Sequence, residues 1–449
     1  MKLIEFTGKG IYEFLDFNIK FNNDLTFLVG GNGSGKSTVL KLVNAILTPN
    51  LKDIFLIPST KLTLTVEINQ LQHTITIINE KKFISFSLNS IKNDILKIEK
   101  IQDEDELGYI LSRHEEPRDY YNNIFLDNKH HPVFNFIHEI DVPIFLGLNR
   151  RDNLDDDVNL YANEIDRMRM SHNKKIIRRN RYINGSLGQS LIETEEIIRN
   201  AYEKIKRFED TQRMSLRDNI ILSAFNMTDL NDVIDENRIV PMNLQEQKEI
   251  VERKEEIELT LKKMGIRNTK LSGAMNSFFA QVEELSSSSP GEGINLAWLI
   301  NKSQIDMISS LVKLIDENNK KVEKRFKNIN KFKDIINHFF EDSNKKLIID
   351  NIGNIKIQKP NSKFTGVDSL SSGERQLLVI FSHLIFKNES NPSGIFVIDE
   401  PELSLHLKWQ KEFIEYALEC SPNTQLIFAT HSPEIIVGNE KKTYSVRSK

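Results

Sequence analysis

The sequence predicts an α/β fold in which both ends of the chain form one domain and a helical segment lies between them. Apolar and polar residues alternate with the period of a β-strand over much of residues 1–30 and 61–90. From about residue 160 to about residue 345 the sequence is charged and helix-periodic, and short apolar strands return after it. The expected domains are therefore 1–158, 159–345 and 346–449.

The N-terminal strands KLIEF and LDFNIKF are expected to form a hairpin that leads into a buried strand, LTFLVG. Further strands are expected at VPIFLGL (142–148), KKLIID, IKIQ, GIFVID and TQLIFAT. In the helical segment, apolar residues recur at spacings of three, four or their multiples: Ile308, Leu311, Ile315, Val322, Phe326, Ile329 and Phe340. These helices are expected to pair into an antiparallel, coiled-coil-like hairpin, with a loop at SSSSPGEG (286–293).

Composition excludes several classes of protein. The net charge of −4 provides no global attraction for nucleic acid, so any such contact needs a local basic patch. The single cysteine, Cys420, excludes a disulfide framework and a Cys-rich zinc site. No signal peptide is evident at the N-terminus, and no apolar run reaches the roughly 18 residues that a membrane span needs. We therefore expect a cytoplasmic protein that does not contact the membrane.

A glycine-rich loop, GGNGSGKST, follows the strand LTFLV and precedes the helix STVLKLVNAIL. It satisfies G-x-x-x-x-G-K-[ST], in which backbone N–H groups cradle phosphate, the lysine reaches the β/γ oxygens and the serine ligates Mg²⁺. This context favours ATP and Mg²⁺ binding over a simple glycine-rich turn. The expected phosphate-binding residues are Gly30, Asn32, Gly33, Ser34, Gly35, Lys36, Ser37 and Thr38, with Ser37 also a metal ligand.

Two later strands end in residues suited to hydrolysis. GIFVIDEPE places Asp399 and Glu400 at a strand end, where the aspartate could hold Mg²⁺ and the glutamate could activate water. TQLIFATHS places His431 in the same position of another strand, where it could touch the γ-phosphate. Each pattern alone also fits a turn after a core strand or a surface histidine. The phosphate loop in the same chain favours the catalytic interpretation.

A second Ser/Gly loop, SLSSGERQ, opens a helix more than 300 residues after the phosphate loop. A helix start of this kind can present backbone N–H groups to an anion. The four motifs in this order resemble those of ATP-binding-cassette (ABC) ATPases, and Leu370, Ser371 and Gly373 match the family signature LSGGQ. The resemblance implies a P-loop ATPase head formed by both chain ends. It also implies a homodimer or higher homo-oligomer in which Ser371 and Gly373 of one head cap the ATP bound by another.

The motifs depart from the transporter pattern at three positions. Ser372 and Glu374 replace the second glycine and the glutamine of the signature, and His406 stands where transporters usually have an aspartate. The forms LSSGE and EPELSLH resemble instead the chromosome-maintenance (SMC) and overcoming-lysogenization-defect (OLD) branches. The glutamine of the family's Q-loop stays open among Gln70, Gln72 and Gln102.

The chain is expected to lack a nuclease of its own. Only eighteen residues follow His431, so the TOPRIM nuclease domain of OLD proteins is not expected, and His130-His131 is interpreted as a surface pair. This outline resembles ATPase subunits of antiphage systems such as Septu, PARIS and some retrons. The resemblance implies a nucleotide-gated scaffold or sensor that assembles or restrains a separately encoded HNH or TOPRIM nuclease.

Two other functions stay open. The chain could be a DNA-repair ATPase of the RecF or SMC type, which clamps DNA on ATP-driven dimerisation, or a regulatory ATP-binding module with negligible turnover. The run RMRMSHNKKIIRRNRY could contact DNA or another nucleic acid, or be a solvated surface. Its basic residues are Arg167, Arg169, Lys174, Lys175, Arg178, Arg179 and Arg181.

Overall fold

The computed structural model describes most of both chain ends and the longest helices between them. The described residues are 1–48, 51–91, 94–100, 123–140, 143–147, 182–184, 187–223, 252–263, single positions between 273 and 283, 296–387 and 394–446. The chain splits into two compact units, one of Met1–Arg199 with Lys331–Lys449 and one of Asn200–Asn330. The sequence-based boundaries at 158 and 345 stay predictions.

A six-stranded parallel sheet is the centre of the first unit. Its strands are, in spatial order, β15 (Thr443–Ser445), β3 (Leu25–Val29), β14 (Gln425–Thr430), β13 (Ile395–Asp399), β8 (Ile144–Gly147) and β9 (Tyr182–Asn184). Strands from both ends of the chain are interleaved in this sheet, with β3 between β15 and β14 and with β8 next to β13, which confirms the predicted α/β head built from both ends. Because all strands are parallel, the loops that follow them meet at one edge.

Burial explains why the sequences of these strands are continuous apolar runs. Every residue of β14 is buried, as are the first four residues of β3 and of β13. Parallel strands are covered on both faces, so they lack the alternation of half-exposed strands. The helix α14 (Leu407–Cys420) contributes to this cover, with the Phe413 ring 5.9 Å from that of Phe428 in β14.

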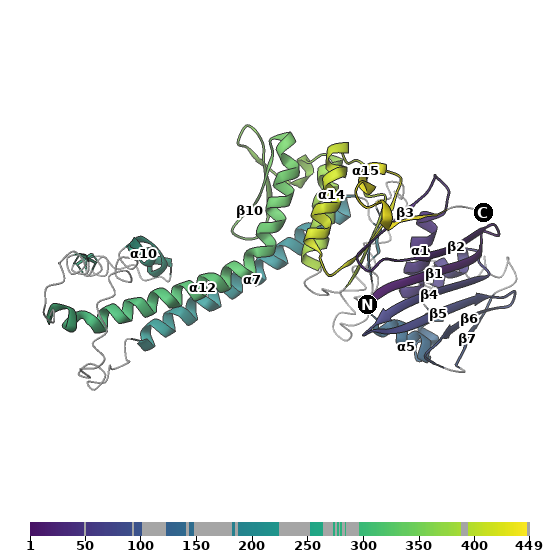
Figure 1. The fold of residues 1–449 in the computed structure, drawn as a ribbon, viewed down its shortest axis with the longest axis horizontal. Helices are drawn as coiled ribbons and strands as arrows, with labels where there is room; N and C mark the ends of the chain where they lie inside the picture. The colour runs from purple at the N-terminus through teal and green to yellow at the C-terminus, as the bar shows by residue number, and fades with distance from the viewer. Residues whose placement is uncertain are drawn as a thin grey trace. The chain divides into compact units, whose positions relative to one another are not determined.

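An antiparallel sheet forms the N-terminal part of the same unit. Its strands are β2 (Leu15–Lys20), β1 (Lys2–Ile11), β4 (Lys61–Ile68), β5 (Leu71–Asn79), β6 (Phe83–Leu88) and β7 (Leu96–Glu99), drawn in purple and blue in Figure 1. The predicted hairpin is β1 and β2, and β2 alternates strictly between buried and exposed residues. The helix α5 (Pro132–Glu139) packs on this sheet, with the Phe134 ring 5.3 Å from that of Phe86.

One buried amide joins the two sheets. The Gln425 side chain at the start of β14 accepts a hydrogen bond from the N–H of Leu3 (2.7 Å) and donates to the carbonyls of Leu3 (2.8 Å) and Asn22 (2.7 Å). Gln425 is fully buried, so these bonds satisfy the polar atoms that its burial removes from water. The side chain of Gln425 thus connects the start of β14 in the parallel sheet to the N-terminal lobe.

A third, small sheet leads to the signature loop. It consists of β10 (Lys346–Ile349), β11 (Ile355–Gln358) and β12 (Phe364–Thr365), all antiparallel, and it includes the predicted strands KKLIID and IKIQ. The turn η3 (Val367–Ser369) and the helix α13 (Ser372–Ser382) follow, and α13 continues into the π-helical turn η4 (His383–Lys387).

The described part of the inserted segment contains two long helices, α7 (Leu187–Ser223) and α12 (Leu296–Phe340), and the shorter α10 (Lys254–Lys263). In the second unit, α7 and α12 run side by side in opposite directions (Figure 1), with the Tyr202 and Phe326 rings 6.0 Å apart. The predicted helical hairpin is confirmed there. The basic run from Arg167 to Arg181 and the loop 286–293 lie outside the described residues. Among the described helices, none is both long and apolar enough to cross a membrane.

Candidate nucleotide-binding and catalytic site

The phosphate loop connects β3 to α1 (Lys36–Leu47), as the sequence predicts. Gly33 and Gly35 have φ angles of 77° and 95°, a region that side chains with a Cβ rarely adopt. A Cβ on Gly35 would come within 2.5 Å of the Phe17 ring, and one on Gly30 within 2.5 Å of the carbonyl oxygen of Val446. The geometry of this loop therefore requires these glycines.

Lys36 is the buried cation of the loop, with 5% of its surface exposed. Its ammonium donates to the carbonyls of Gly30 (2.9 Å) and Gly31 (3.1 Å) and lies 2.6 Å from Nε2 of His431. Because an ammonium only donates, Nε2 is the acceptor in this contact. Burial lowers the pKa of Lys36 below its ordinary value, against the opposite effect of nearby carboxylates.

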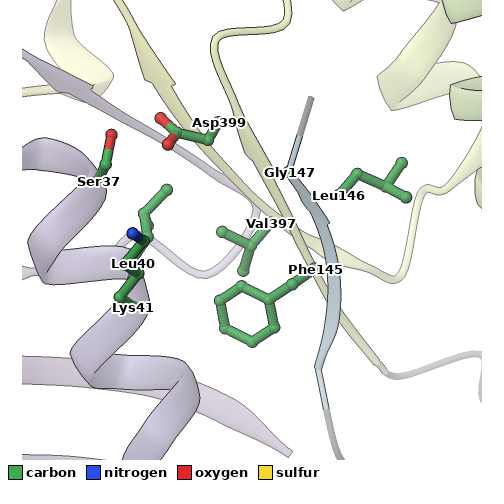
Figure 2. A pocket seen from close by; sticks show the side chains of 8 residues that line it. All are labelled: Ser37, Leu40, Lys41, Phe145, Leu146, Gly147, Val397 and Asp399. Carbon is green, nitrogen blue, oxygen red and sulfur yellow. The ribbon is translucent and has the colours of Figure 1, made fainter. Parts of the chain in front are cut away.

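Asp399 lies at the end of β13, beside the phosphate loop. The Ser37 hydroxyl donates to its carboxylate, and Figure 2 shows that carboxylate directed toward Ser37. Burial raises the pKa of Asp399, against the hydrogen bond from Ser37. Its Oδ1 is buried and has no hydrogen-bond partner among the described residues, and the same is true of the Ser34 hydroxyl.

These oxygens fit a magnesium ion. Ser37 and Asp399 line a small pocket together with Leu40, Lys41, Phe145, Leu146, Gly147 and Val397 (Figure 2). Mg²⁺ prefers oxygen ligands, keeps several waters and commonly uses only one or two protein side chains plus substrate phosphates. The described residues contain no cluster of three His, Cys, Asp or Glu side chains that could hold a metal ion on its own.

Glu400 follows Asp399 in an unusual backbone conformation. Its φ of 53° is rare for a residue other than glycine and costs conformational energy. The N–H of Glu400 donates to the carbonyl of Ala429 in the neighbouring strand (2.8 Å), which extends the pairing of β13 with β14 by one residue. Glu400 and His431 thus stand directly after two adjacent strands of the sheet.

The signature loop is held by the chain's own polar groups. Ser371 caps α13: its hydroxyl accepts from the N–H of Glu374 (3.3 Å), and the Glu374 carboxylate accepts from the N–H of Ser371 (2.6 Å). Glu374 is buried and also accepts from Lys345 (2.8 Å) and from the Ser343 hydroxyl (2.8 Å). The sequence predicts free N–H groups at this helix start, but the capping box occupies two of them.

Gly373 contacts the loop after β13 rather than the phosphate loop of the same chain. A Cβ at this position would overlap the backbone carbonyl oxygen of Ser404. Ser371 is exposed. The structure therefore brings Lys36, Asp399 and His431 together, whereas the contacts of Ser371 and Gly373 within the chain are with other segments.

The remaining residues singled out from the sequence lie at exposed or half-buried positions or outside the described residues. Asn32 and Gly33 are exposed, and Thr38 is half-buried in α1. Gln70 and Gln72 are exposed around the turn between β4 and β5, and Gln102 lies outside the described residues. His406 caps α14 by accepting from the N–H of Lys408.

One residue of the site, Glu402, was not singled out from the sequence. Its Oε1 accepts a hydrogen bond from the backbone N–H of His431 at 2.6 Å. The only signal in the sequence is its place two residues after Glu400, in the loop that follows the acidic strand.

Comparison with known proteins supports the prediction that the chain is an ATPase. A family model described as an AAA ATPase domain matches residues 1–436. The probable ATPase of retron Vc95 from Vibrio cholerae serotype O1 biovar El Tor is 29% identical over 109 residues, which are 20% of this chain and 21% of that protein. The probable ATPase of retron Ec83 from Escherichia coli is 25% identical over 191 residues, 35% of each chain. The matches thus span about a fifth and about a third of these relatives.

Solved structures of SMC heads are also similar, at low scores. The Smc head domain of Pyrococcus furiosus, bound to the C-terminal domain of ScpA, has a TM-score of 0.39 at 14% identity and covers 100% of this chain and 94% of its own. The SMC head domain from Thermotoga maritima has a TM-score of 0.36 at 13% identity, with 97% and 92% covered. Because the family model covers most of the sequence, the chain belongs to the AAA ATPase domain family, and its predicted similarity to retron ATPases is confirmed.

Proposed function

We propose that the chain binds Mg-ATP and hydrolyses it at composite sites shared by two heads. The observation that carries the proposal is the 2.6 Å contact between Lys36 and His431, beside a buried carboxylate oxygen of Asp399 that has no partner among the described residues. A phosphate chain and its metal ion supply the counterparts that such groups need.

In this proposal each group has one task. Lys36 holds the β- and γ-phosphates, and the N–H groups of Gly30, Asn32, Gly33, Ser34, Gly35 and Thr38 complete the phosphate cradle. Ser37 and Asp399 hold Mg²⁺, which neutralises charge on the phosphates when bound. Glu400 orients the attacking water and takes its proton, and His431 contacts the γ-phosphate.

The second head completes each site through Ser371 and Gly373. Support comes from the exposure of Ser371 and from a capping box that fixes the loop without any nucleotide group. A rigid helix start with an exposed serine is suited to bind a γ-phosphate presented by another molecule. The proposed assembly is therefore a head-to-tail homodimer, or a higher oligomer made from such dimers.

The role of Glu400 is tested by Glu400→Gln. Loss of the general base is expected to lower kcat by about 10²–10⁴, while ATP binding is retained because Lys36 and Ser37 are untouched. The matched control is Glu415→Gln on the exposed side of α14, which should hydrolyse ATP at the normal rate. Ordinary turnover in Glu400→Gln would contradict the assignment.

Sharing of sites is tested by mixing two inactive variants. Ser371→Arg should bind ATP but not hydrolyse it, and Lys36→Ala should fail to bind it. A mixed dimer contains one site with both defects and one intact site, so random mixing should restore about a quarter of the normal activity. No recovery in a mixture shown to exchange subunits would exclude shared sites.

We further propose that the ATPase is a nucleotide-gated scaffold or sensor that assembles or restrains a separately encoded nuclease. The similarity to proteins named as probable ATPases of retrons supports this role. The test is affinity purification of Glu400→Gln from the native host in Mg-ATP, with identification of all bound proteins by mass spectrometry. A stoichiometric HNH or TOPRIM protein is the expected result.

The same purification tests the DNA-clamp alternative. DNA and repair factors without a nuclease would favour it. In that case charge reversal at Arg178 and Arg179 should weaken DNA binding and reduce its dependence on salt.

A further inference from the structure

The loop that follows Glu400 carries a carboxylate bonded to the strand end beside it. The Oε1 atom of Glu402 accepts the backbone N–H of His431 at 2.6 Å. A bond of this length between an N–H and a charged carboxylate belongs to the stronger class of protein hydrogen bonds. It connects the loop after β13 to the loop after β14, which bear Glu400 and His431.

The backbone that presents Glu402 is fixed from the other side. The side-chain amide of Gln376 in α13 donates to the carbonyl of Pro401 (2.7 Å), and Gly373 leaves no space between α13 and the carbonyl of Ser404. Within the loop, the N–H of Leu405 donates to the carbonyl of Glu402 (2.9 Å). Glu402 is therefore held in place by α13 and by its own turn.

The histidine at the other end of the bond has one ring contact that bears on the chemistry. Nε2 of His431 lies 2.6 Å from the ammonium of Lys36. The next residue, Ser432, is fixed separately, because its hydroxyl donates to Gln410 at 2.6 Å. Of these bonds, the one to Glu402 is donated by the His431 backbone itself.

The second oxygen of Glu402 is also informative. Oε2 is buried and has no hydrogen-bond partner among the described residues. Burial of a carboxylate with one oxygen unpaired is unfavourable, and such a group persists where the surrounding structure holds it. The negative charge also acts on Lys36, where it opposes the effect of burial on the pKa of the ammonium.

We propose that Glu402 is a positioning residue of the hydrolysis site, which sets the His431 ring against Lys36 by binding the His431 backbone N–H. The inference rests on the proposed function, because it takes His431 to act on the γ-phosphate. It adds a third carboxylate to Asp399 and Glu400, with a role that is neither metal binding nor proton transfer.

The test is a double-mutant cycle of Glu402→Ala and His431→Ala, measured by kcat and KM for ATP. Glu402→Ala should lower kcat about tenfold and leave KM within about twofold, which corresponds to the loss of one positioning bond. The double variant should be no slower than His431→Ala, because no ring is left to position.

Conservative variants separate positioning from a general structural role. Glu402→Gln keeps an acceptor for the N–H and should retain kcat within about threefold. Glu402→Asp keeps the charge but is one methylene too short, so it should resemble Glu402→Ala. If a thermal melt shows that the Glu402→Ala variant is not folded, Glu402→Asp takes its place in the double-mutant cycle. Glu434→Ala is the control, since Glu434 contacts Ser432 and not the His431 N–H.

The outcomes are distinguishable. Multiplicative losses in the double variant, or a Glu402→Gln variant as slow as Glu402→Ala, would overturn the inference and leave the proposed function intact. Normal turnover of His431→Ala alone would overturn the proposed role of His431 and, with it, the inference.

Discussion

The phosphate loop and the signature loop are both Ser/Gly loops that open a helix, but their polar groups are satisfied differently. At the phosphate loop, the Ser34 hydroxyl and Oδ1 of Asp399 are buried without hydrogen-bond partners among the described residues. At the signature loop, Ser371 and Glu374 satisfy each other, and Lys345 neutralises the carboxylate. The first loop is suited to be completed by a ligand, whereas the second is prearranged by protein groups and presents a fixed shape.

Within this comparison of the two loops, the largest expected effect is that of Gly35→Ala, a substitution in the phosphate loop. Alanine at φ 95° is strained, and its Cβ would lie 2.5 Å from the Phe17 ring. We expect ATP affinity to fall about 100-fold, measured by titration with a fluorescent nucleotide. The control is Gly366→Ala, since a Cβ there meets no atom within 4 Å. Normal ATP affinity in the Gly35→Ala variant would contradict the conclusion that the geometry of the phosphate loop requires glycine at this position.

The corresponding change in the signature loop, Gly373→Ala, should act on turnover and not on affinity. Its Cβ would overlap the carbonyl oxygen of Ser404, in the loop that contains Glu402. We expect kcat to fall about tenfold and the affinity for ATP to stay within about twofold, both measured on the same preparation. A loss of affinity as large as that of Gly35→Ala would erase the distinction between the two loops.

A third expected effect concerns stability and comes from Glu374→Gln. The variant keeps hydrogen-bonding atoms but loses the ion pair with Lys345, at a cost of about 2 kcal/mol near pH 7. The measurement is the free energy of unfolding in urea.

The pH dependence of that cost follows from the pKa of Glu374. Burial alone raises it, but the hydrogen bonds from Lys345, the Ser371 N–H and Ser343 outweigh burial, so the pKa lies below the ordinary 4.5. A depressed carboxyl pKa contributes stability that is complete above the unfolded pKa and is lost as the pH falls through the folded one. The difference between the native protein and Glu374→Gln should therefore shrink below about pH 4.5. A constant difference would mean that the pair with Lys345 contributes nothing.

Local sequence patterns were sufficient for part of the site. The phosphate loop is contiguous in sequence, Asp399 is the last residue of a buried strand, and Glu400 and His431 each follow one. Their proximity was predictable because the carboxyl ends of parallel strands meet at one edge of a sheet.

The interactions that hold these groups in place were not predictable. Lys345 and Glu374 are 29 positions apart, and so are Glu402 and His431. No periodicity of helix or strand connects residues at that spacing, so these pairs arise only from the tertiary fold. The strands β9 and β15 were missed for another reason: each has three residues, too few for any alternation to be recognised.

The order of strands in the parallel sheet also has a consequence for how the protein is made. The strand that carries the phosphate loop, β3, lies between β14 and β15, and the Gln425 amide at the start of β14 bonds to Leu3 across 422 positions of the chain. A ribosome adding 5–20 residues per second needs roughly 20–80 s to reach β14 after it has made β3. Contacts so distant in sequence form late, because the intervening chain must be closed into a loop first. The antiparallel lobe can pair its strands early in synthesis, whereas β3 acquires its neighbours only when the strands encoded some 400 codons later emerge.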